Sequence, residues 1–188
     1  MVYMSYLSSD EKLQLLKIAR EAIVARLNDL PRPVVVTDSE KLRGNGAAFV
    51  TLKIDGQLRG CIGYTEAFQP LLRTVQECAV AAAFADPRFH PLLPQECDNI
   101  TVDISVLTPL VLATSPDEIE VGKHGIAIEA RGRHGLLLPQ VATEYNWDRE
   151  TFLEQTCYKA GLPRNAWREP TTKIYLFEAE VFAEEDFA

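Results

Sequence analysis

Residues 47–63 read AAFVTLKIDGQLRGCIG, and this stretch decides the fold of the N-terminal half of the chain. Aliphatic side chains alternate with polar ones up to Ile54, and Asp55-Gly56 is a strong turn signal between two such runs. The stretch therefore predicts two antiparallel strands that are joined in a hairpin.

The register of this hairpin decides which side chains share a face, because a slip by one residue turns every side chain over. We expect a three-residue connection from Asp55 to Gln57, since a two-residue turn would mix aliphatic and polar side chains on each face. Arg59 and Cys61 then lie on the face opposite the aliphatic side chains. The expected pairs are Ile54 with Leu58, Leu52 with Gly60, and Val50 with Ile62.

Helical and extended patterns follow one another irregularly outside the hairpin. Ser8 and Glu11 form a capping box before a helix that ends near Asn28, and a second helix is expected to begin near Pro70. Period-two alternation predicts a strand at 100–106. A Gly-x-His-Gly element that occurs twice within 122–138 predicts another hairpin. Finally, Asp148 should cap a helix that stops at Gly161, before a strand at 173–182.

Strands mixed with a few helices, without regular βαβ alternation, indicate the α+β class. We expect one domain, in which the second hairpin begins a smaller lobe.

Composition excludes several classes of protein. The chain has 188 residues, of which 47% are hydrophobic, so it can bury a substantial core. No apolar stretch approaches the roughly 20 residues of a membrane span, and the N-terminus lacks the pattern of a secretion signal. We therefore expect a cytoplasmic protein with no membrane partner.

The net charge of −8 argues against binding of duplex nucleic acid over the whole surface, because phosphate contacts need clustered Lys and Arg. The charge is unevenly distributed, however. Residues 41–60 carry four basic side chains against Asp55 alone, whereas residues 169–188 are strongly acidic. Such asymmetry is typical of ordinary solvated faces. The alternative is a site for an anionic small molecule or an unpaired nucleotide, and the only place for it is near 41–60.

The cysteines do not predict a metal site or a disulfide framework. Cys61, Cys78, Cys97 and Cys157 include no C-x-x-C pair, and the three His residues lack the spacing of metal ligands. No metal is expected, and no cofactor is assigned. In a reducing cytosol most of these cysteines should be buried thiols.

The segment Leu58-Arg59-Gly60-Cys61-Ile62-Gly63 is the first candidate for chemistry. An Arg two residues before a Cys in a strand would favour the thiolate, as a nucleophile or a redox sensor needs. Gly60 and Gly63 suggest close approach by a ligand or by another part of the backbone. In the alternative interpretation Cys61 is an inert thiol, Arg59 forms an ion pair, and both glycines serve packing.

His124, Asp86 and Arg88 are further candidates. His124 follows a lysine in a predicted turn, and it could instead act as a general base for Cys61. Asp86 and Arg88 lie in a loop that two prolines keep from being helical, and they could bind a ligand. Alternatively, Asp86 caps a tight loop that Arg88 fixes by two hydrogen bonds.

The order of motifs along the chain resembles the AMMECR-type domain family. These motifs are LRGCIG, DPRFHPL, ITVDISVLTP, GKHGIAI, LLLPQVA, a Trp, a Phe-Leu pair and CYKAGLP, and they cover nearly the whole chain. LRGCIG is the hallmark of the family. Further family-like positions are Asp86, Arg88, Phe89, His124, Pro139, Gln140, Lys159 and Gly161. The additional Arg133-His134-Gly135 element departs from the family pattern.

The resemblance implies a larger lobe, at about 1–115 with the C-terminal strand 172–183, that holds a mainly antiparallel sheet with flanking helices. A smaller sheet-containing lobe, at about 116–170, is implied as well, with a cleft between the two lobes. It also implies a component of a modification system that works with a Memo-like protein and a radical S-adenosylmethionine enzyme, for which nucleobases or RNA are the proposed substrates. The family has no assigned activity, so whether the chain is an enzyme stays open. The alternative is a non-catalytic module that binds or scaffolds a protein partner, with Cys61 structural.

Overall fold

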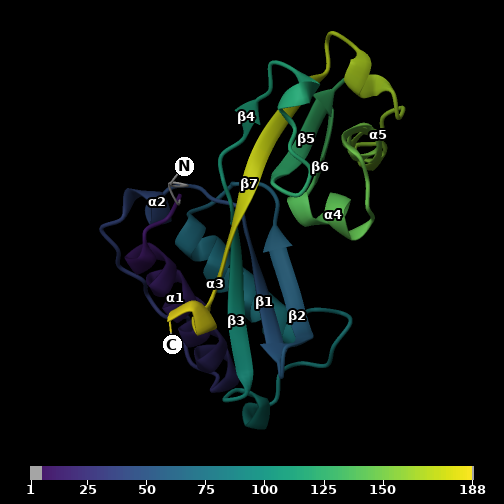
Figure 1. The fold of residues 1–188 in the computed structure, drawn as a ribbon. Coiled ribbons are helices and arrows are strands. Elements are labelled where there is room, and N and C mark those ends of the chain that lie inside the picture. The colour runs from purple at the N-terminus through teal and green to yellow at the C-terminus, as the bar shows by residue number, and fades with distance from the viewer. Residues whose placement is uncertain (1–5, 188) are drawn as a thin grey trace. The chain divides into compact units, whose positions relative to one another are not determined.

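The computed structural model describes residues 6–187, and the chain divides into two compact units. Unit 1 comprises residues up to 106 together with those from 180 onward, and unit 2 comprises 107–179. Antiparallel strands and helices in both units confirm the α+β class (Figure 1).

The helices are α1 (Ser9–Leu27), α2 (Glu40–Arg43), α3 (Leu71–Phe84), α4 (Pro139–Glu144) and α5 (Arg149–Lys159). The strands are β1 (Ala48–Ile54), β2 (Gln57–Tyr64), β3 (Ile100–Leu107), β4 (Val111–Leu112), β5 (His124–Ala130), β6 (Arg133–Leu137) and β7 (Lys173–Ala183).

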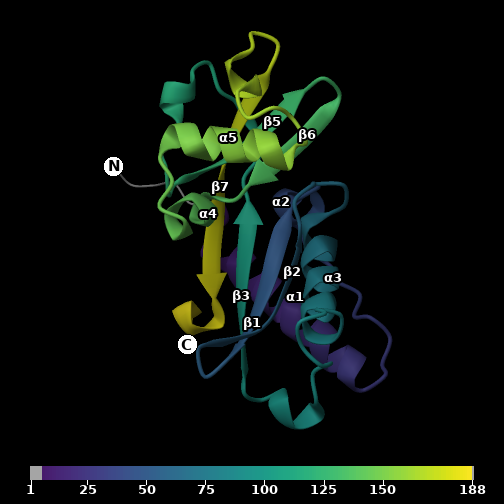
Figure 2. The same ribbon diagram turned by 90° about the vertical axis from the view of Figure 1, so that its right-hand side faces the viewer.

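The core of unit 1 lies between its helices and one face of its sheet. Strands follow the order β2-β1-β3, and α1 and α3 cover the same face in both views (Figures 1 and 2). The predicted capping box is present at the start of α1, where Ser8 and Glu11 each accept a hydrogen bond from the other's backbone N–H. Val50, Leu52 and Ile104 are fully buried under the helices.

The observed hairpin corrects part of the expected register. Asp55 and Gly56 form a two-residue turn with φ values of 50° and 74°, so Ile54 lies opposite Gln57 and the expected pairing with Leu58 is wrong. A bulge at Arg59 then inserts one residue into β2. This extra residue restores the predicted pairs of Leu52 with Gly60 and Val50 with Ile62, and the aliphatic side chains stay on the core face.

Unit 2 has its own core. Strands β4 and β5 flank β7, and β6 pairs with β5, which confirms the second predicted hairpin. Helix α5 lies across this hairpin in Figure 2 and buries Phe152 and Leu153. Asp148 caps α5 through the Thr151 N–H, and Gly161 ends the helical segment at φ 71°.

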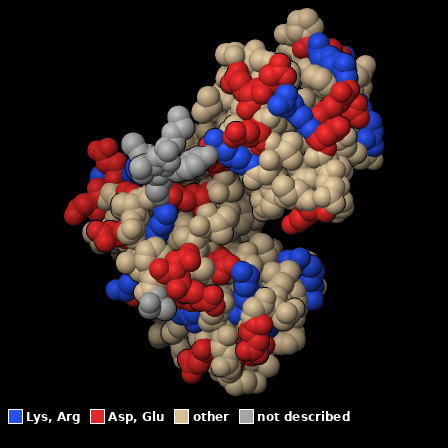
Figure 3. Space-filling model, in the orientation of Figure 1, with Lys and Arg blue, Asp and Glu red and all other residues tan. Residues whose placement is uncertain are grey.

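No helix within 6–187 is long and apolar enough to cross a membrane, and no group of three or more His, Cys, Asp or Glu side chains in this range could hold a metal ion. On the face of the protein shown in Figure 3, acidic and basic side chains are intermixed rather than gathered by sign.

Candidate functional site

Unit 1 brings the LRGCIG segment of β2 against the loop that follows α3. Asp86, in that loop, is 4% exposed. Its Oδ2 accepts hydrogen bonds from the Cys61 N–H (2.9 Å) and from Arg88 Nη2 (2.7 Å), and its Oδ1 accepts from Arg88 Nε (3.0 Å) and from the Arg88 N–H (3.1 Å). The Arg88 guanidinium is the main reason that the pKa of Asp86 lies well below its usual range. Arg88 therefore fixes the loop by two-point bonding to Asp86.

This contact protects the backbone at the edge of the sheet. β2 is the outermost strand, so the N–H and C=O groups on one side of it have no neighbouring strand. At Cys61 these two groups bond to the side chains of Asp86 and Arg88, the C=O accepting from Arg88 Nη2 at 3.4 Å. The loop thus substitutes for a neighbouring strand at the centre of the motif.

Arg59 lies at the bulge and is 7% exposed. Its Nε and Nη2 donate to the two carboxylate oxygens of Glu96, both at 2.9 Å, and Nη2 also donates to the His90 carbonyl at 3.0 Å. The ion pair lowers the pKa of Glu96 to about 2, chiefly through the hydrogen bonds from Arg59. The Arg59 charge, which the sequence suggested would act on Cys61, is therefore paired with Glu96.

Glu96 was not found by sequence reasoning. It lies 37 residues after Arg59, in the short turn Pro94–Glu96, and no local pattern connects the two positions. Among the described residues Arg59 Nη1 is buried without a hydrogen-bond partner.

The Cys61 thiol is half-buried, on the sheet face opposite the helices. Thr51, directly across on β1, donates a hydrogen bond from its hydroxyl to Sγ at 3.2 Å. Within 6–187 no histidine or carboxylate is hydrogen-bonded to this sulfur. Cys61 thus has a hydroxyl partner but lacks the adjacent base of a nucleophile pair.

Both glycines of the motif have packing roles. A Cβ atom at Gly60 would lie 2.1 Å from the Ala82 carbonyl oxygen of α3, so only glycine allows helix and strand to approach this closely. A Cβ atom at Gly63 would lie 2.3 Å from the ring of Phe49, its partner on β1. Packing within unit 1 therefore explains why both positions are glycine, without a bound ligand.

His124 belongs to unit 2, at the start of β5. Its Nδ1 accepts a hydrogen bond from the Glu120 N–H at 3.1 Å, and its Nε2 lies 3.9 Å from the Glu178 carboxylate. Because Nδ1 accepts a hydrogen bond, it carries no proton in the neutral ring. The ring proton is then on Nε2, which faces Glu178.

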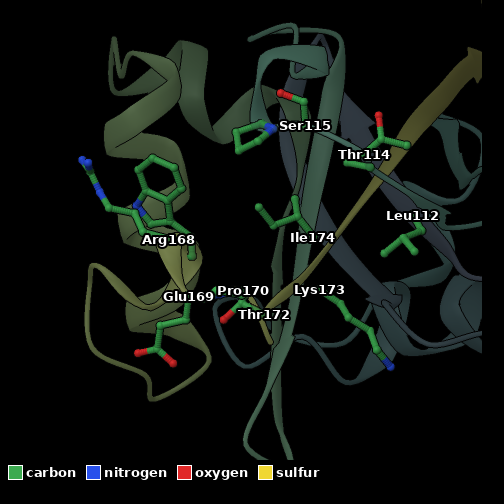
Figure 4. Close-up of a pocket in the computed structure, with 12 residues that line it drawn as sticks. Leu112, Thr114, Ser115, Arg168, Glu169, Pro170, Thr172, Lys173 and Ile174 are labelled. Carbon is green, nitrogen blue, oxygen red and sulfur yellow. The ribbon is translucent and has the colours of Figure 1, made fainter.

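Unit 2 also holds a cavity of about 700 Å³ that sequence reasoning did not find. One wall comes from the segment that carries Thr114 and Ser115, the opposite wall carries Arg168 and Glu169, and Ile174 lies between them (Figure 4). The Arg168 guanidinium lies 4.5 Å from the ring centroid of Trp167. None of the candidate residues from the sequence lines this cavity.

The fold and the site define an α+β protein of two compact units with the LRGCIG motif on an edge strand. The family model described as AMMECR1 matches residues 16–182, and the chain belongs to this family. A protein of Methanothermobacter thermautotrophicus is 46% identical over 186 residues, covering 95% of this chain and 97% of that protein. A protein of Methanopyrus kandleri is 42% identical, covering 96% and 91%. The crystal structure of an uncharacterized Pyrococcus horikoshii protein is 40% identical with a TM-score of 0.72, covering 91% of this chain and 90% of that one.

Proposed function

We propose that this chain is a non-catalytic binding component of a modification system. Its partners would be a Memo-like protein and a radical S-adenosylmethionine enzyme, as the family resemblance implies, and the substrates would be nucleobases or RNA. The binding surface would be the edge of β2 with the loop that carries Asp86 and Arg88.

The observation that supports a binding role is how the polar residues of the motif are used. Arg59 is paired with Glu96, and Asp86 with Arg88. Both pairs make two-point contacts that hold the loop against the strand, which favours a rigid recognition surface over a reaction centre.

The second candidate is an enzyme component in which Cys61 is the nucleophile. Two observations favour it: the thiol is half-buried rather than enclosed, and the Thr51 hydroxyl contacts its sulfur. An anionic small molecule or unpaired nucleotide would be the substrate, with Arg59, Gly60, Gly63, Asp86 and Arg88 as ligand-binding residues.

Reconstitution separates the two candidates. The chain would be mixed with the Memo-like protein and the radical S-adenosylmethionine enzyme of its own organism, and complex formation and modification of RNA from that organism would be measured. A binding component with structural Cys61 keeps both properties in Cys61→Ser, and so does the matched control Cys97→Ser, since Cys97 is also half-buried. Loss of modification with an intact complex in Cys61→Ser alone supports the nucleophile, and absence of any complex contradicts the proposed system.

A further inference from the structure

At Gly63, two residues after Cys61, the outer edge of β2 has no neighbouring strand. In an antiparallel pair, hydrogen-bonded and non-hydrogen-bonded residue pairs alternate. Cys61 opposite Thr51 is a non-hydrogen-bonded pair, because its N–H donates to Asp86 instead. Gly63 opposite Phe49 is two residues further along and is therefore also a non-hydrogen-bonded pair, so the N–H and C=O of Gly63 point away from β1.

No described residue forms a hydrogen bond with these two outward groups of Gly63. Gly63 is half-buried, and because glycine has no side chain, its exposed surface is backbone. The loop with Asp86 and Arg88 occupies the edge at Cys61 and goes no further. An exposed N–H and C=O pair on an edge strand is a template for an added strand.

A cation lies at one end of this open edge. The Arg88 side chain is 54% exposed although it bonds to Asp86, and its Nη2 reaches the Cys61 carbonyl. No described residue bonds to its Nη1. An arriving carboxylate can therefore bond to Arg88 without displacing Asp86.

An apolar contact lies at the other end. Phe68 is 58% exposed, and its ring centroid is 5.0 Å from that of Tyr64, the last residue of β2. Tyr64 in turn packs against the core of unit 1. The edge thus carries an aromatic surface anchored to the core, where an aliphatic side chain of an added strand can bury itself.

We propose that the β2 edge at Gly63 binds an extended segment of a partner protein as an added antiparallel strand, with an aliphatic side chain on Phe68 and a carboxylate on Arg88. This inference rests on the proposed function in assuming a protein partner. Antiparallel register pairs the segment with Tyr64, Gly63 and Ile62, and its next residue, three positions after the one opposite Tyr64, leaves the edge where Asp86 occupies it and lies beside Arg88. The expected recognition pattern is therefore an aliphatic residue followed three positions later by Asp or Glu.

The test uses the full chain and the blocked peptide acetyl-Thr-Leu-Thr-Val-Glu-amide as the probe. Backbone amide NMR and hydrogen exchange would be measured during titration. We expect exchange of the Gly63 amide to slow by about tenfold or more at saturation, because its N–H becomes hydrogen-bonded. An unchanged Gly63 amide, or peptide-induced shifts confined to another surface, would overturn the inference.

A double-mutant cycle tests the carboxylate contact. Arg88→Gln and the peptide's Glu→Gln change should each weaken binding about 2- to 5-fold, and together they should weaken it no more than either alone. Fully additive effects would show that Arg88 does not contact the peptide's carboxylate. Phe68→Ala changes an exposed side chain outside the loop, and it should weaken binding even if Arg88→Gln disturbs the fold.

Three further outcomes are distinguishable. Protection of Gly63 that rises with protein concentration in the absence of peptide would mean that a second copy occupies the edge, which contradicts the partner assignment. Peptide binding at Gly63 without any complex in the reconstitution experiment would contradict the proposed function and leave the edge site intact. A complex that forms equally well with Phe68→Ala and Arg88→Gln would overturn the edge site alone.

Discussion

Arg59 and Glu96 form a two-point ion pair in which Nε–Oε1 and Nη2–Oε2 are both 2.9 Å apart. Their side chains are 9% and 21% exposed, so the pair is largely removed from water. It joins the bulge of β2 to the turn that precedes β3. The hallmark arginine of the motif thus stabilises the edge strand on which the candidate site lies.

Removing Glu96 should therefore destabilise unit 1. Glu96→Ala leaves the Arg59 guanidinium buried without its counter-ion, and we expect a loss of about 2 to 4 kcal/mol in the free energy of unfolding, measured by urea denaturation. Glu21→Ala is the control, because Glu21 forms an exposed pair with Lys17 and should cost less than about 1 kcal/mol. Equal effects of the two variants would show that the Arg59 pair is no stronger than a surface pair.

Stability should also fall in acid because of the same carboxylate. The pKa of Glu96 is about 2 in the folded chain, below its ordinary value of 4.5, so the unfolded chain takes up this proton first as the pH falls. The contribution is complete above about pH 5 and is lost as the pH falls from there towards 2. Urea midpoints measured between pH 6 and 3 should decrease less steeply for Glu96→Gln than for the wild type.

Asp86 contributes in the same direction, since its pKa is also lowered by Arg88. Glu96→Gln should therefore reduce the acid dependence without abolishing it. An acid dependence identical to that of the wild type would contradict the assignment to Glu96.

Local signals in the sequence predicted the elements of the fold well. The capping box at Ser8, the cap at Asp148 and the stop at Gly161 act over a few residues, and all three are present. The hairpin was also predicted, but the expected three-residue connection was wrong. The prediction assumed two regular strands. The bulge at Arg59 instead allows a two-residue turn while the aliphatic side chains stay on the core face.

The contacts of the candidate site were harder to predict because they are not local. The two-point bonding of Asp86 to Arg88 joins near neighbours in sequence and was anticipated as an alternative to ligand binding. The partnership of Arg59 with Glu96 and the bond from the Cys61 N–H to Asp86 span 37 and 25 residues, and only the folded chain brings those groups together. An ion pair of Arg59 was anticipated as one alternative, but the charge pattern did not identify Glu96 as its partner.

The close contact between β2 and α3 predicts a strong effect of adding one methyl group. In Gly60→Ala the new Cβ would lie 2.1 Å from the Ala82 carbonyl oxygen, and backbone cannot yield as a flexible side chain can. We expect a loss of about 3 kcal/mol or more, or failure to fold, measured as the urea midpoint. Gly56→Ala is the matched control: nothing lies within 4 Å and φ is +74°, so only backbone strain of about 1 kcal/mol applies. A Gly60→Ala protein as stable as Gly56→Ala would show that the strand and helix can separate.

The four thiols should divide into two classes of reactivity towards iodoacetamide in the native chain. Cys78 and Cys157 are fully buried, and burial raises the pKa of Cys78 to about 12, so both should react only after local unfolding. Cys61 and Cys97 are half-buried and should react at least about tenfold faster at pH 8. Mass spectrometry of digested samples over time measures each site, and Cys97 gives the rate of a half-buried thiol outside the motif. A Cys61 rate well above that of Cys97 would favour the nucleophile over the binding role, whereas a rate as slow as that of Cys78 would show that the motif encloses its thiol.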